Sequence, residues 1–128
     1  MKKRAVRIVV MVLVAGVLLG SATLGAIVWR IHQSVQAYCG VAQQAHPHPG
    51  DEVAALIDFM NSDSHSFRDR NLAIWTLGRL RDAKALPSLK SVYTGEQCEH
   101  DKSLCQYELE KAIRLCGGIP NPPRKTRH

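Results

Sequence analysis

Four cysteines and a group of histidines are the residues of this chain best suited to chemistry. An even set of thiols suits either disulfides or a metal site, and the cysteines are Cys39, Cys98, Cys105 and Cys116. Sequence alone leaves three pairings open. We favour Cys98–Cys105, which would close the loop into the last expected helix, and Cys39–Cys116, which would fasten the stalk to that helix. Cys105 and Cys116 fall about three turns apart on one face of the helix, so they cannot pair with each other.

A competing hypothesis makes the same residues reactive thiols or zinc ligands. Cys98, His100 and Cys105 could offer two sulfurs and one nitrogen to zinc, with His65 or His46 as a fourth ligand. The spacing differs from a C-x-x-C knuckle, and no C-x-x-C motif is present for thiol exchange or haem attachment. Histidines in a Pro-rich turn usually stay solvated. We therefore predict that the chain binds no metal and no other cofactor.

Motifs of known enzymes are missing from the sequence. It contains no glycine-rich phosphate loop, no G-x-S-x-G elbow and no H-E-x-x-H pattern. Carboxylates such as Asp58, Asp63 and Asp69 fall at positions expected to be exposed. We predict that the protein is not an enzyme.

The net charge of +6 is not distributed as in a nucleic-acid-binding protein. Seven of its 17 Lys and Arg residues lie before the first apolar segment or in the last five residues. Between Asp51 and Gly118 the chain has nine Lys or Arg against eleven Asp or Glu. A phosphate-binding face needs clustered positive charge, so we predict no binding to nucleic acid.

The segment Ile8–Trp29 has no charged residue over its 22 positions. A helix of this length spans about 33 Å, enough for a hydrocarbon core of about 30 Å. The rival interpretation is a signal peptide cleaved after Gly20-Ser21-Ala22, which would release a soluble domain beginning near Thr23. We favour the uncleaved anchor because the apolar character continues to Trp29.

The charges that flank the apolar segment predict its orientation. Four cations precede it, whereas only Arg30 follows it closely, so the N-terminus should stay in the cytoplasm. The rest of the chain would then lie outside the cytoplasm, in the periplasm, where disulfides persist. Gly16 and Gly20 have the spacing of a G-x-x-x-G pair, which could support a homodimer within the membrane.

Beyond the membrane the chain reads as a series of helices. Ile31 to Ala45 places its apolar residues on one face and should continue the membrane helix as a stalk. His46-Pro-His-Pro-Gly50 should end that stalk. Further helices are expected from about Asp51, over Phe67–Leu80, after Asp82, and over Ser103–Cys116, with Gly117-Gly118 as a stop.

Two copies of one unit emerge when the chain is shifted by 36 positions, because apolar residues of the two copies then align. The first copy contains Arg70-x-x-Ala-Ile-Trp-Thr-Leu-Gly-x-Leu-x-Asp82, followed by Ala85-Leu-Pro-x-Leu89. This pattern resembles the HEAT repeat in its short, phycobilisome-lyase-like form. The second copy departs from it, with Gln106 in the place of Arg70. The resemblance implies a stack of α-hairpins that binds other proteins.

We therefore expect a non-catalytic scaffold that docks a protein partner. The solvent side of the second helix should carry the contact residues, namely Arg70, Ile74, Trp75 and Arg81. Trp75 could instead cover the stalk helix.

The predicted fold is all-α: an N-terminal transmembrane helix that continues into a stalk, then a HEAT-like solenoid of two repeats. Its parts are a basic cytoplasmic tail (1–7), the transmembrane helix (8–29), the stalk and Pro/His linker (30–50), the repeat domain (51–118) and a flexible basic tail (119–128).

Overall fold

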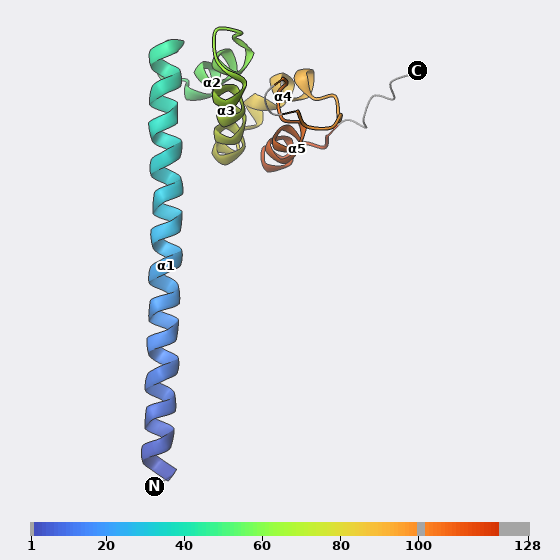
Figure 1. Ribbon diagram of the computed structural model, residues 1–128. Helices are drawn as coiled ribbons and strands as arrows, with labels where there is room; N and C mark the ends of the chain where they lie inside the picture. Colours follow the sequence, from blue (N-terminus) through green and yellow to red (C-terminus); the bar gives the residue numbers. More distant parts are fainter. Residues whose placement is uncertain (1, 100–101, 121–128) are drawn as a thin grey trace. The chain divides into compact units, whose positions relative to one another are not determined.

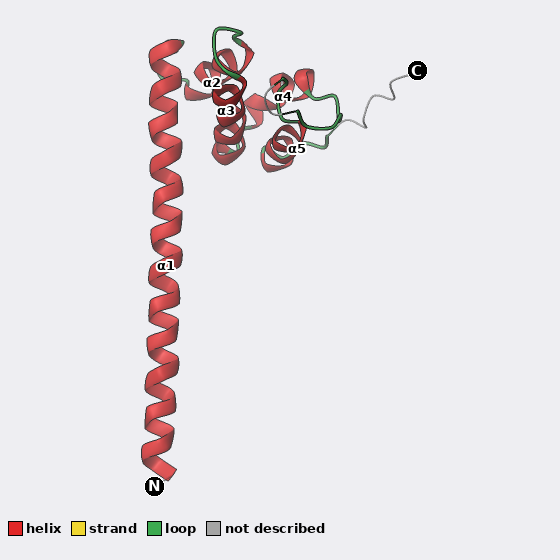
Figure 2. Cartoon of the chain, in the orientation of Figure 1, coloured by secondary structure: helices red, strands yellow, loops and turns green. Residues whose placement is uncertain are grey.

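The computed structural model describes residues 2–99 and 102–120, and all regular secondary structure in these ranges is helical (Figures 1 and 2). The predicted tail 119–128 lies almost wholly outside the described residues. The elements, in chain order, are α1 (Lys2–Ala45), α2 (Glu52–Asn61), α3 (Phe67–Leu80), the 3₁₀ turn η1 (Ala83–Ala85), α4 (Leu86–Val92) and α5 (Gln106–Leu115).

The chain divides after Ser34 into two compact units. In the first unit the apolar side chains of α1 are exposed, including Leu13, Leu19 and Trp29. Among the described residues, α1 is the one helix long and apolar enough to cross a membrane, judged by length and composition. It runs without a break to Ala45, as predicted for a span that continues into a stalk.

The second unit begins with the last turns of α1, whose apolar face is buried as predicted. Val35, Cys39 and Ala42 are at most 6% exposed. The Tyr38 ring meets the edge of Phe59 from α2 at 5.7 Å, and its hydroxyl donates to the Asp69 carbonyl at 2.7 Å. The face therefore serves as one wall of the folded unit.

Local capping explains where α2 and α3 begin. The Asp51 carboxylate accepts a hydrogen bond from the Ala54 N–H at 3.0 Å, and the Ser66 hydroxyl accepts one from the Asp69 N–H at 3.2 Å. Both side chains satisfy N–H groups that the helix itself cannot pair. The bounds of α3, Phe67–Leu80, are those predicted.

The last two helices differ from the prediction in detail. Asp82 caps η1 rather than α4, and α4 follows from Leu86 with a proline in its first turn. The final helix begins at Gln106, not at Ser103, because Cys105 has extended backbone angles and its N–H donates to the Asn71 side chain at 2.8 Å. Gly117, with φ +85°, ends α5 as predicted.

Helix α3 is the centre of the second unit, with α2 packed on one side and α5 on another (Figure 1). Gly78 permits the closest approach, since a Cβ there would lie 3.0 Å from the Ala112 Cα of α5. Ala73, Ile74 and Leu77 of α3 are fully buried. Because both α2 and α5 pack on α3, its buried face is wider than contact with a single helix would require.

Candidate functional site

The structure brings together one of the two predicted cysteine pairs. The Sγ atoms of Cys98 and Cys105 lie 3.0 Å apart, within an ångström of the S–S bond length of about 2.05 Å. Neither pair is bonded, and all four cysteines are free thiols in this structure. Cys105 is buried, and burial together with the neighbouring Cys98 raises the pKa of its thiol.

Cys39 and Cys116 have separate surroundings and do not form the predicted bridge. Burial, with the Glu52 carboxylate nearby, raises the pKa of Cys39 to about 12. The Cys116 thiol instead contacts the Leu77 carbonyl at 3.6 Å, and burial raises its pKa as well. Each thiol is a small buried group in its own part of the core.

Gln106 fixes the loop that leads to Cys98, a role that sequence reasoning missed. Its Oε1 accepts hydrogen bonds from the N–H groups of Thr94 at 2.7 Å and Gly95 at 3.2 Å, and its Nε2 donates to the Leu104 carbonyl at 3.1 Å. The Tyr107 N–H, at the start of α5, donates to the Cys98 sulfur at 3.2 Å. The amide thus holds the cysteine loop against the helix start.

The zinc hypothesis gains no support from this loop. His100 lies outside the described residues. Within 2–99 and 102–120, no group of three or more His, Cys, Asp or Glu side chains is arranged to hold a metal ion.

Two of the four predicted docking residues are structural. Ile74 is fully buried, so the prediction that it lies on the solvent side of α3 is wrong. The Arg70 side chain is only 12% exposed, and it donates to the Met60 carbonyl at 2.7 Å and to Asp63 at 2.8 Å. Arg70 therefore closes the C-terminal end of α2, and most of its side chain is covered.

Trp75 and Arg81 do reach the surface, at different places. Trp75 is half-buried, and the Arg79 guanidinium lies over its ring at 5.3 Å, a cation–π arrangement. Trp75 lines a cleft with residues of α5 and is partly exposed. Arg81 is exposed and ends α3 in a left-handed conformation, with φ 56°.

A continuous surface joins Trp75 to the exposed side of α5. Trp75 and Arg79 share a narrow cleft with Lys111 and Leu115. The same α5 residues border a shallow hollow of about 320 Å³, which Tyr107, Glu110 and Arg114 complete. We call this surface the α3/α5 face and define it by Trp75, Arg79, Tyr107, Lys111 and Leu115.

A larger and more polar hollow, of about 550 Å³, lies where the linker meets α2. Two of its carboxylates, Asp51 and Asp82, already have partners. Asp51 caps α2 and lies 3.8 Å from the Lys84 ammonium, and Asp82 accepts from the Lys84 N–H at 2.9 Å. In this hollow, Asp51 and Asp82 therefore serve as the N-caps of α2 and η1.

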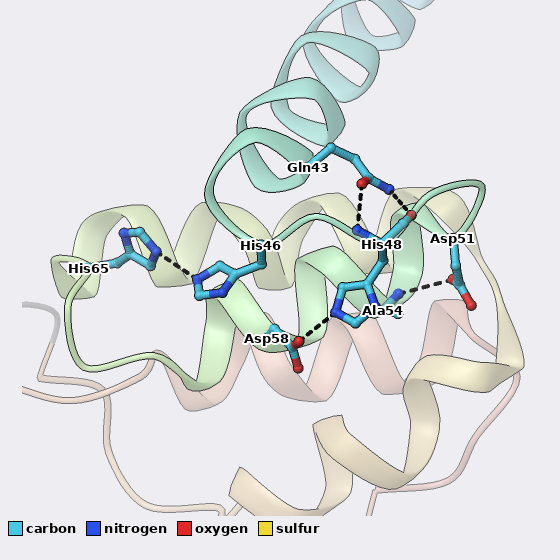
Figure 3. Close-up of polar contacts among 7 residues, drawn as sticks. All are labelled: Gln43, His46, His48, Asp51, Ala54, Asp58 and His65. Carbon is cyan, nitrogen blue, oxygen red and sulfur yellow. Dashed lines mark hydrogen bonds and ion pairs between the residues drawn. The ribbon is translucent and has the colours of Figure 1, made fainter.

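The Pro/His linker is held by three polar contacts, shown in Figure 3. The Nε2 atoms of His46 and His65 lie 3.1 Å apart, and the His48 Nε2 lies 2.6 Å from the Asp58 carboxylate. The Gln43 side chain exchanges two hydrogen bonds with the His48 backbone. The linker histidines are thus partnered, contrary to the expectation that they stay solvated.

No family model, curated protein or solved structure matches this chain.

Proposed function

We propose that the protein is a non-catalytic, membrane-anchored docking scaffold whose α3/α5 face binds another protein. The observation that carries the proposal is the composition of this face. Trp, Tyr and Arg are the residues most enriched at the centres of protein interfaces, and the face presents one of each. Tyr107 in particular is 66% exposed beside an open hollow.

The apolar half of α1 supports the anchored part of the proposal. Its flanking charges favour a cytoplasmic N-terminus and a periplasmic helical unit. Apart from the adjacent residues and backbone of α1 itself, no atom in the described part of the chain lies within 4 Å of a Cβ placed at Gly16 or Gly20. The G-x-x-x-G pair therefore has room for a second copy of the helix.

We also propose that the helical unit is a HEAT-like stack of two hairpins, α2–α3 and α4–α5. A similar contact within each hairpin supports this. At the start of α3, Arg70 binds the carbonyl of Met60 near the end of α2. At the start of α5, Gln106 reaches the carbonyl of Val92 at the end of α4, at 3.5 Å. In each hairpin a polar side chain of the second helix satisfies the end of the first.

The docking role is tested by removing the two aromatic side chains of the face. Full-length protein with Trp75→Ala and Tyr107→Ala, extracted from membranes in mild detergent, should lose the partner that co-purifies with the wild type. Truncating an interface hot spot typically costs about 2 kcal/mol or more. The matched control is Val41→Ala, which shortens an exposed side chain of α1. Unchanged partners in the double variant would refute the assignment.

The Cys98–Cys105 contact, with its sulfur atoms 3.0 Å apart, raises a second candidate function, as a thiol protein, which competes with a disulfide at the same pair. We expect this pair to be a disulfide in protein prepared without reductant, because the sulfurs already meet. Intact mass after unfolding and alkylation should then show two modified cysteines, Cys39 and Cys116. Four modified cysteines would show that Cys98 and Cys105 are free thiols and would support the thiol function instead.

A further inference from the structure

We propose that His46 and His65 bind a divalent transition-metal ion of the zinc class through their Nε2 atoms. The two atoms face one another at 3.1 Å (Figure 3). Ligands around a tetrahedral zinc, each about 2.0–2.1 Å from the metal, lie about 3.3 Å from one another. To coordinate one ion, the two Nε2 atoms must move apart by a few tenths of an ångström, and the rings must tilt so that both lone pairs point at the metal.

Both rings are held in place before any ion binds. The His65 ring stacks on Phe59 with centroids 3.7 Å apart and planes 5° apart. The His46 ring meets the edge of the same Phe59 at 6.0 Å, and its backbone N–H still donates to Ala42 at the end of α1. One phenylalanine thus orients both imidazoles, so little side-chain freedom is lost on binding.

The local charge favours a cation. Residues 46–69 contain five acidic side chains and one basic one, Arg68. The next cation, Arg70, is bound to the Met60 carbonyl and to Asp63. Imidazole nitrogens suit zinc, copper and nickel better than magnesium or calcium, which selects the class of ion.

The site would hold its ion with two protein ligands and open positions. No third His, Cys, Asp or Glu completes it among the residues that the structure describes. Water would therefore fill the remaining positions. Because both histidines are half-buried, the ion and its water ligands can reach their Nε2 atoms from solvent. Because His46 follows α1 and His65 precedes α3, a bound ion would fasten the end of the stalk to the α2–α3 loop.

Zinc titration by calorimetry tests the site, on full-length protein in detergent without a polyhistidine tag. A Cys98→Ser background removes one of the two adjacent sulfurs that could capture zinc instead. His46→Gln and His65→Gln should each weaken zinc binding at least about tenfold, because each removes one of two ligands. The matched controls are His48→Gln, whose ring pairs with Asp58, and His32→Gln, which is exposed on α1; both should bind as the background does.

A thermal melt gives a second readout that does not depend on the calorimetric signal. Zinc at a hundred times its dissociation constant should raise the Tm of the background protein by at least about 5 °C, and should not do so in the His46 or His65 variants. No zinc binding by the background protein, or equal affinity in the His46 and His48 variants, would overturn the proposal. The 3.1 Å contact would then be a hydrogen bond between the two imidazoles.

Discussion

Truncating Leu77 to alanine should lower the free energy of unfolding of the helical unit by about 3–4 kcal/mol. Leu77 is fully buried on α3, the helix that packs against both α2 and α5. Loss of its side chain leaves a cavity between elements that cannot collapse toward one another without separating from their other neighbours. For a domain of this size that is a large share of the total stability.

Urea unfolding followed by Trp75 fluorescence measures this loss, in a Trp29→Phe background so that only the helical unit reports. Leu72→Ala is the matched control, because Leu72 lies on the same helix but is 42% exposed. We expect the control to cost less than about 1 kcal/mol. Equal costs at positions 72 and 77 would mean that α3 is not the buried centre of the unit.

Replacing Gly78 with valine should lower the free energy of unfolding by about 2–3 kcal/mol or prevent folding. The first added carbon would lie 3.0 Å from the Ala112 Cα and 3.1 Å from its Cβ, so α3 and α5 would have to move apart. Backbone atoms of α5 cannot rotate out of the way as a flexible side chain could.

Gly40→Val is the matched control for the second prediction. Gly40 also lies inside a helix, yet apart from the adjacent residues and backbone of α1 itself, no atom of the described residues lies within 4 Å of a Cβ placed there. Valine forms helix somewhat better than glycine, so Gly40→Val should leave stability unchanged or raise it slightly. Thermal melts that show the two variants shifted in opposite directions would agree with the structure. A neutral Gly78→Val would contradict the close α3–α5 contact.

Local signals explain why much of the fold could be predicted from the sequence. The predicted helix over Phe67–Leu80 has the bounds of α3 in the structure, and the face of Val35, Cys39 and Ala42 is buried as expected. The start of α5 was missed because it depends on Asn71, 34 positions earlier, which binds the Cys105 N–H. No local pattern reports such a contact.

The candidate site was less predictable for the same reason. The sequence predicts Ile74 in solvent because packing against a single helix would bury only one face of α3. In the structure both α2 and α5 pack on α3, so Ile74 is buried as well. Arg70 resembles a surface cation in sequence, yet its side chain turns back to the end of α2. His46 and His65 meet only because the linker and the α2–α3 loop converge on Phe59.

Photo-cross-linking from the α3/α5 face tests the docking account most directly. A benzophenone amino acid would be placed at position 107, on the exposed side of α5, and for comparison at position 91, which is exposed on α4. Irradiation of intact cells should give a defined protein adduct from position 107 and none from position 91. The adduct should disappear when Trp75→Ala is added. Adducts of equal yield from both positions, or none from position 107, would contradict the account.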